Sequence, residues 1–179
     1  MRLFIAIEIP DDLKKMIAGL REDIPGARWV PEEQIHLTLA FLGEVEDAVF
    51  ELLNSALAGI HVTEFELCFS ATGCFPGRER PRVLWLGVKP HPQLDKLASE
   101  VRTAVTTCAI PQEERRFSAH ITLARLNAAP SRELDGFIEQ PQKQRIHTFR
   151  VSEFILFQSR LTQQGAVHIP LRSFLLATV

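Results

Sequence analysis

The chain carries the same short histidine–threonine motif twice. Residues 36–42 read HLTLAFL and residues 120–126 read HITLARL, so five of the seven positions are identical. The two copies start 84 residues apart, which is nearly half of the 179-residue chain. Repetition at this separation indicates an internal duplication. Packing explains the shared aliphatic positions, but it does not explain why both copies also share a histidine and a threonine.

Strand geometry predicts where the polar side chains of the two motifs point. In an extended strand, alternate side chains lie on opposite faces. His36 and Thr38 therefore share one face, as do His120 and Thr122, while the aliphatic residues of each motif point to the opposite face, into the core, and Phe41 is expected on that opposite face too. If two such lobes face each other, two imidazoles and two hydroxyls converge in one cleft.

Two histidines on opposite sides of one phosphorus atom can perform an in-line displacement. Histidine has an ordinary pKa near 6.5, so one ring can accept a proton from water while the other gives a proton to the departing oxygen. The threonine hydroxyls can donate hydrogen bonds to the non-bridging oxygens. The predicted substrate centre is a phosphodiester, and the reaction needs neither metal nor cofactor. Because the motif is symmetric, the residues alone do not say which histidine is the acid.

Other catalytic signatures are missing from the sequence. It contains no H-E-x-x-H or H-x-H metal pattern, no G-x-S-x-G nucleophile turn and no G-x-x-x-x-G-K-[ST] phosphate loop. The three cysteines form no C-x-x-C pair, which argues against a structural zinc site and a disulfide scaffold. Tyrosine is absent, so no tyrosine serves as nucleophile or stacking surface.

Composition and charge are those of an ordinary globular protein. Hydrophobic residues make up 46% of the chain, the formal net charge is −2 and the sequence pI is about 6.3. This pI argues against a protein that binds nucleic acid mainly through bulk positive charge, because such domains usually have a pI above ~9. No apolar run approaches the roughly 20 residues of a membrane span, and the N-terminal apolar stretch is too short for a signal peptide. We expect a cytoplasmic protein with no membrane partner.

Apolar periodicity predicts strands and helices that alternate irregularly. The strands often follow one another directly, which favours an α+β fold with antiparallel sheets over a doubly wound parallel sheet. No linker divides the chain, so we expect one domain over residues 1–179. The predicted strands cover residues 3–9, 29–30, 35–42, 65–75, 82–88, 119–126, 147–157 and 167–176, and the predicted helices cover 11–22, 47–57, 92–108 and 131–138.

Motifs along nearly the whole chain resemble one known family. The two H-[LI]-T-L motifs occur with RLFIAI at the start, WVPEEQI and FLG around the first motif, and PRVLWL midway. Together they resemble the RNA 2′,3′-cyclic phosphodiesterases, formerly called 2′-5′ RNA ligases, of the two-histidine phosphoesterase superfamily. The resemblance implies a bilobal α+β fold, with two pseudo-symmetric antiparallel β-sheets, helices packed outside and a central cleft.

The resemblance also implies an activity and its partners. The expected reaction opens an RNA 2′,3′-cyclic phosphate to a 2′-phosphomonoester, with reversible 2′-5′ ligation as a side activity. The expected partners are RNA ends that carry the cyclic phosphate, including tRNA fragments and mononucleotides, and the expected state is a monomer. Two alternatives stay open: a non-catalytic module that binds RNA ends or nucleotides, and a phosphodiesterase for small cyclic nucleotides.

By motif position, the resemblance gives each site residue a role. His36 is the proton donor, His120 is the proton acceptor, and Thr38 and Thr122 bind the phosphate. Arg125 matches an arginine that follows the second motif in relatives and helps to hold the phosphate. Strict alternation would point Arg125 away from the cleft, so this role requires a bend or bulge after Thr122. Otherwise Arg125 is a surface residue at a strand end.

Two departures from the family pattern and one basic loop have open interpretations. Ala119 stands where relatives often have proline, and His168 stands where they often have tyrosine. His168 could stack on a base, add a third titrating group or be a neutral surface replacement. The loop that carries Arg78, Arg80 and Arg82 could hold RNA backbone, although a solvated charged loop is the simpler interpretation.

Overall fold

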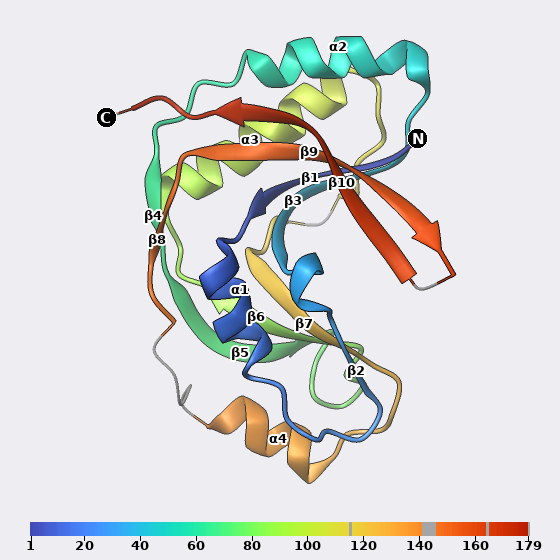
Figure 1. Cartoon of the computed structure of the whole chain (residues 1–179), viewed down its shortest axis with the longest axis vertical. Coiled ribbons are helices and arrows are strands. Elements are labelled where there is room, and N and C mark those ends of the chain that lie inside the picture. Colours follow the sequence, from blue (N-terminus) through green and yellow to red (C-terminus); the bar gives the residue numbers. More distant parts are fainter. Residues whose placement is uncertain (115, 141–145, 164, 179) are drawn as a thin grey trace.

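The computed structural model describes residues 1–114, 116–140, 146–163 and 165–178. Helices and strands alternate along the chain as Figure 1 shows. In chain order the elements are β1 (Arg2–Glu8), α1 (Asp11–Ala18), β2 (Ala27–Trp29), the 3-10 helix η1 (Glu32–Gln34), β3 (His36–Glu44), α2 (Asp47–Ala58), β4 (Phe65–Leu67), β5 (Phe69–Phe75), β6 (Val83–Val88), α3 (Pro92–Thr107), β7 (His120–Leu126), α4 (Arg132–Glu139), β8 (Phe149–Val151), β9 (Glu153–Thr162) and β10 (Gly165–Leu175).

Eight strands form one antiparallel sheet in the order β10-β9-β1-β3-β7-β6-β5, with β2 paired to β7. Strands β3 and β7 meet at a single pair, Leu37 with Ile121. These two residues hold the same position in the two motifs, and both are fully buried. The sheet therefore consists of two half-sheets related by an approximate two-fold axis at this pair. The predicted α+β class with pseudo-symmetric antiparallel sheets is confirmed, and the two half-sheets join at one point.

The second sheet has two strands, one from each half of the internal duplication. β4 pairs with β8 so that Glu66 is opposite Arg150, and these residues are again 84 positions apart. The predicted strands at 65–75 and 147–157 are each interrupted, at Cys68 and at Ser152. The interruption lets β4 and β8 leave the main sheet and pair with each other. The break at Cys68 is not visible in the apolar pattern, because Leu67 and Phe69 on both sides of it are apolar, whereas the second break coincides with the polar pair Ser152 and Glu153.

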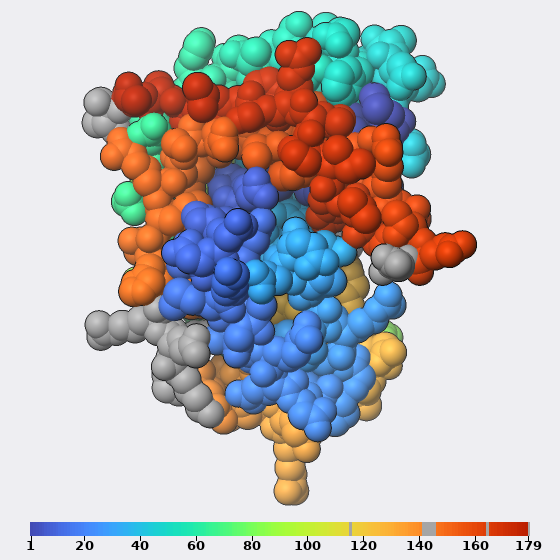
Figure 2. Space-filling view, viewed as in Figure 1, coloured from blue at the N-terminus to red at the C-terminus, as the bar shows by residue number. Residues whose placement is uncertain are grey.

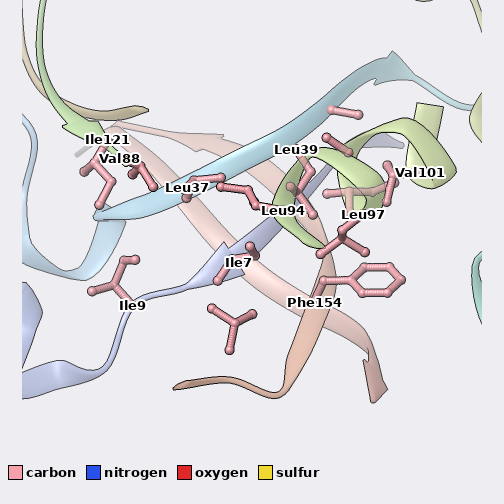
Figure 3. Packing of buried hydrophobic residues seen from close by; sticks show 14 of the residues in the cluster. Ile7, Ile9, Leu37, Leu39, Val88, Leu94, Leu97, Val101, Ile121 and Phe154 are labelled. Atoms are coloured by element: carbon pink, nitrogen blue, oxygen red, sulfur yellow. The ribbon is translucent and has the colours of Figure 1, made fainter. Parts of the chain in front are cut away.

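The two halves of the chain exchange strands and helices. The half-sheet that contains β1 and β3 is completed by β9 and β10 from the C-terminal half of the chain. Helix α3 follows β6, yet it packs against β3 across the junction. Figure 3 shows Leu37 and Leu39 of β3 beside Leu94 and Leu97 of α3. This exchange is what one two-lobed domain over residues 1–179 would require, and that domain assignment stays a prediction.

Helix ends follow local chemistry. Ser131 caps α4, as its sequence predicts, because its Oγ accepts a hydrogen bond from the Leu134 amide at 3.2 Å. Helix α1 ends at Ala18, four residues before the predicted end, because Gly19 follows and the next amides bond to carbonyls three residues back. In the described part of the chain, no helix has both the length and the apolar composition needed to cross a membrane.

Candidate active site

The two motif histidines occupy equivalent places at the first residues of β3 and β7. In each, Nδ1 lies within hydrogen-bond distance of the carbonyl oxygen two residues earlier, at 2.6 Å from Gln34 for His36 and 2.7 Å from Ser118 for His120. A carbonyl only accepts, so Nδ1 is the protonated donor in both rings. Nε2 is then the nitrogen of each ring that can exchange a proton with a ligand.

The junction of the half-sheets brings the two motifs together. Because Leu37 is directly opposite Ile121 in an antiparallel pair, the preceding His36 is next to Thr122, and His120 is next to Thr38. The two histidines are then diagonal neighbours, a relation that spaces residues by about 7–8 Å. We call the face of the sheet that carries these four residues the site face. The predicted constellation of two imidazoles and two hydroxyls is therefore assembled on one surface.

Burial makes the two imidazoles electrostatically different. The pKa of His36 is lowered to about 4, first because burial removes water from the charged form, and further because His168, Lys14 and His120 lie near. The hydrogen bond to the Gln34 carbonyl opposes this effect, because it favours the charged ring. At neutral pH, His36 is accordingly uncharged in the unliganded protein.

Aromatic neighbours also differ between the two histidines. The His36 ring centroid lies 5.0 Å from that of Phe4 and 5.2 Å from that of His168, which meets His36 edge-on. His120 has one such contact given by the structure, edge-on to Phe75 at 5.0 Å. Strand β10 brings His168 to the site, and burial lowers the pKa of its ring. The sequence singled out His168 but could not place it beside His36.

Arg125 reaches the site face through a β-bulge. Consecutive residues of β6 pair with Ala124 and Thr122 of β7. Leu123, which lies between these two residues, has no partner in this register and is the extra residue of the bulge. The bend that the role of Arg125 requires is thus present after Thr122. Strand β3 has the same irregularity at Leu39. The role of Arg125 in holding a phosphate stays a prediction.

The basic loop before β6 is tied to helix α4. Arg78 donates a hydrogen bond to Glu139 at 2.7 Å and lies 3.7 Å from Asp135. Its guanidinium is therefore engaged within the protein, which favours the structural interpretation for this arginine. Arg80 and Arg82 of the same loop are exposed.

Potential metal ligands do not gather in the described ranges. Among those residues, no group of three or more histidine, cysteine, aspartate or glutamate side chains is placed to hold a metal ion. All three cysteines are free, with Cys68 and Cys74 half-buried and Cys108 buried. The site face offers general acids, bases and hydrogen-bond donors.

Comparison with known proteins gives consistent similarities. A family described as LigT like Phosphoesterase matches twice, over residues 5–85 and 86–168, so each half of the duplication is matched separately. An RNA 2′,3′-cyclic phosphodiesterase of Thermotoga maritima is 34% identical over 94% of this chain and 91% of its own. One of Archaeoglobus fulgidus is 29% identical over 97% of this chain and 99% of its own.

Solved structures show the same architecture. The crystal structure of Escherichia coli LigT complexed with 3′-AMP has a TM-score of 0.84 and 31% identity, covering 98% of this chain and 97% of that one. The structure of Usb1 from Kluyveromyces marxianus is similar in fold alone, with a TM-score of 0.52 and 11% identity over 95% of this chain and 97% of that one.

Proposed function

The chain belongs to the LigT-like phosphoesterase family, and on that premise we propose that it hydrolyses RNA 2′,3′-cyclic phosphate ends to 2′-phosphomonoesters. The observation that carries the proposal is the pair of equivalent histidines, each with Nδ1 held by a backbone carbonyl and Nε2 left for the substrate. The relatives named as RNA 2′,3′-cyclic phosphodiesterases support the substrate class.

The proposed reaction is one in-line displacement at phosphorus. Nε2 of His120 accepts a proton from water as the water oxygen forms a bond to phosphorus. The bond between phosphorus and the 3′-oxygen breaks, and that oxygen takes the proton from Nε2 of His36. The hydroxyls of Thr38 and Thr122 donate hydrogen bonds to the non-bridging oxygens, and Arg125 adds a positive charge. The acid and base roles follow the family resemblance.

The proposed donor role of His36 requires that substrate binding protonates it. In the unliganded protein the pKa of His36 is about 4, so the ring has no proton on Nε2 at neutral pH. A phosphodiester brings a negative charge next to the ring, and an adjacent opposite charge favours the imidazolium. Binding would thus raise the pKa of His36 back toward its ordinary value, and the substrate itself would supply the condition for acid catalysis.

The proposal also covers the substrates, the side reaction, the cellular location and the oligomeric state. The substrates are RNA ends with the cyclic phosphate, among them tRNA fragments and mononucleotides. When a 5′-hydroxyl replaces water in the same displacement, its oxygen forms the bond to phosphorus, the 3′-oxygen leaves and a 2′-5′ phosphodiester results. The same groups catalyse the reverse of this transfer, so the ligation is reversible. The protein acts as a cytoplasmic monomer, without metal or cofactor.

Product analysis with a defined oligonucleotide tests this function. The purified protein is incubated in EDTA with an RNA oligonucleotide that ends in a 2′,3′-cyclic phosphate, and the monoester is identified by chromatography against both standards. We expect the 2′-phosphate, with the rate unchanged by EDTA. Absence of turnover would leave the binding-module alternative, and a rate that requires added metal would contradict the mechanism.

A small cyclic nucleotide remains the second candidate substrate. The solved structure of E. coli LigT with 3′-AMP shows that this relative binds a mononucleotide. Comparing kcat/KM for the oligonucleotide and for adenosine 2′,3′-cyclic phosphate separates the two candidates. A higher value for the oligonucleotide favours RNA ends, whereas an equal or lower value favours the mononucleotide.

A further inference from the structure

Phe75 lies beside the second motif histidine and has no role in the proposed hydrolysis. Across β7, β6 and β5, Arg125 is paired with Val83, and Val83 is paired with Phe75. Residues directly opposite in neighbouring strands point to the same face, so Phe75 lies on the site face. Its ring meets that of His120 edge-on, with the centroids 5.0 Å apart. Phe75 therefore borders the histidine to which the proposed mechanism gives the role of base.

Trp85 gives Phe75 a rigid support. Trp85 is opposite Thr122 on β7 and opposite Gly73 on β5, so its indole also belongs to the site face. A Cβ on Gly73 would overlap three atoms of the indole, and a Cβ on Gly87 would lie 3.2 Å from its Cζ3. The indole thus lies against the backbone at two glycines. The ring of Phe75 packs against this fixed indole with a centroid distance of 5.2 Å.

The internal repeat shows that Phe75 is more open than its counterpart in the other half. Phe4 on β1 and Val83 on β6 hold equivalent places, because each is opposite the fifth residue after its motif histidine. Phe4 is in turn opposite Phe157, and the two rings stack and bury each other. Val83 is smaller than phenylalanine, and Phe75 opposite it is only half-buried. Part of the Phe75 ring is therefore available to a ligand.

The strand that carries Phe75 forms an edge of the sheet. The half-sheet of β1 and β3 continues through β9 to β10, and the hairpin of β9 and β10 projects beyond the body of the molecule (Figure 2). The half-sheet of β7 and β6, by contrast, ends at β5 in the described strand order. Phe75 is the last residue of β5, and the loop with the exposed Arg80 and Arg82 follows it. A ligand that extends from His120 over Phe75 reaches these cations next, and cations bind phosphate groups.

We propose that Phe75 is the stacking surface for the base of an acceptor nucleoside, the one whose 5′-hydroxyl replaces water in 2′-5′ ligation. The inference rests on the proposed function, because in-line displacement places the attacking oxygen opposite the departing 3′-oxygen and next to Nε2 of His120. The 5′-oxygen forms its bond to phosphorus and gives its proton to His120, while the bond to the 3′-oxygen breaks and that oxygen takes the proton of His36. The ribose and base of the acceptor then lie on the side of His120, where the ring of Phe75 is in contact with the imidazole.

Competition between water and an acceptor tests the proposal within one reaction. The donor is 5′-O-methyluridine 2′,3′-cyclic phosphate, and the acceptor is adenosine or methyl riboside, which has the same 5′-hydroxyl but no base. Chromatography gives the ratio of the 2′-5′ ligated product to the 2′-monophosphate. Both products need the same two histidines, so a purely catalytic defect leaves this ratio unchanged. We expect the wild type to prefer adenosine, and we expect Phe75→Leu to lower the ratio for adenosine by about 10-fold or more, the effect of losing one base–aromatic stack, without changing the ratio for methyl riboside.

A second phenylalanine of β5 provides the matched control. Phe69 is also half-buried, but it is opposite Val88 of the core, so Phe69→Leu should leave both ratios unchanged. Phe75→Trp keeps an aromatic ring and should keep the preference for adenosine. The inference is overturned if the wild type hydrolyses the donor but shows no preference for adenosine or ligates neither acceptor, or if Phe75→Leu lowers both ratios equally or neither. If the wild type does not hydrolyse the donor, the proposed function itself fails, and this outcome is distinct from the others.

Discussion

Titration of His36 is the electrostatic feature with the largest expected effect on stability. Its pKa is about 4 in the folded protein against 6.5 in the unfolded chain. Between these values the unfolded state binds more protons, so the stability due to His36 is present above pH 6.5 and is lost as the pH falls toward 4. One pKa unit corresponds to about 1.36 kcal/mol, and the loss at pH 5 is about 2 kcal/mol. This is an upper value, because the ring is half-buried and water screens part of its charge.

Urea unfolding of the wild type and His36→Gln measures this contribution. The free energy of unfolding should fall between pH 7.5 and pH 5 by about 2 kcal/mol more in the wild type than in His36→Gln, since glutamine has no charge to gain. His168 and Lys14 are unchanged in both proteins, so the difference isolates His36. Equal pH dependence of the two proteins would refute the reasoning, as would an NMR titration that places His36 near 6.5.

The same titration in the presence of a ligand tests the link to catalysis. A nucleoside 2′-monophosphate, the product of the proposed reaction, should raise the pKa of His36, because the bound anion favours the imidazolium. The NMR resonance of the ring reports this pKa directly. If the pKa of His36 does not change at saturating ligand, the anion binds elsewhere and His36 does not meet the phosphate.

Three further substitutions test the site and the packing of the sheet that supports it. Thr38→Val and Thr122→Val should each lower kcat/KM by about 100-fold, because each removes one hydrogen bond to the charged oxygens of the transition state; losses below twofold would exclude this role. Gly73→Ala should lower the free energy of unfolding by about 1–3 kcal/mol, because the added Cβ would lie 2.3 Å from Cζ2 of Trp85. Gly77→Ala is the matched control, since the added Cβ meets nothing within 4 Å, and an equal effect of both alanines on urea unfolding would contradict the packing argument.

The sequence was sufficient for the motif strands and their polar faces. The period-two pattern of residues 36–42 correctly predicted Leu37 in the core and His36 and Thr38 on the other face, because the core imposes this alternation on any half-buried strand. The same pattern was wrong for Phe41, which it placed on the core face: Ala40 is buried and Phe41 is exposed. That change of face depends on the bulge at Leu39, which the register with β1 skips, and a register is a property of two strands together.

Long-range pairing also explains the other features that the sequence left open. His168 is 132 residues from His36 in the chain, and only the register of β10 on β9 brings the two rings together. Helix α3 was predicted at nearly its observed bounds, but its packing on β3 follows from the exchange of elements between the two halves. Local patterns determine elements and faces, whereas contacts between distant elements depend on the register of the whole sheet.

The central claim is that His36 and His120 act on one phosphate as a single acid–base pair. Measuring kcat/KM on a 2′,3′-cyclic phosphate for His36→Ala, His120→Ala and the double variant tests it most directly. Each single substitution should lower kcat/KM by about 10³-fold or more, and the double variant should be only slightly slower, because a pair that works as a unit is lost with either member. A single variant that keeps most of its activity, or losses that multiply fully in the double variant, would contradict the claim.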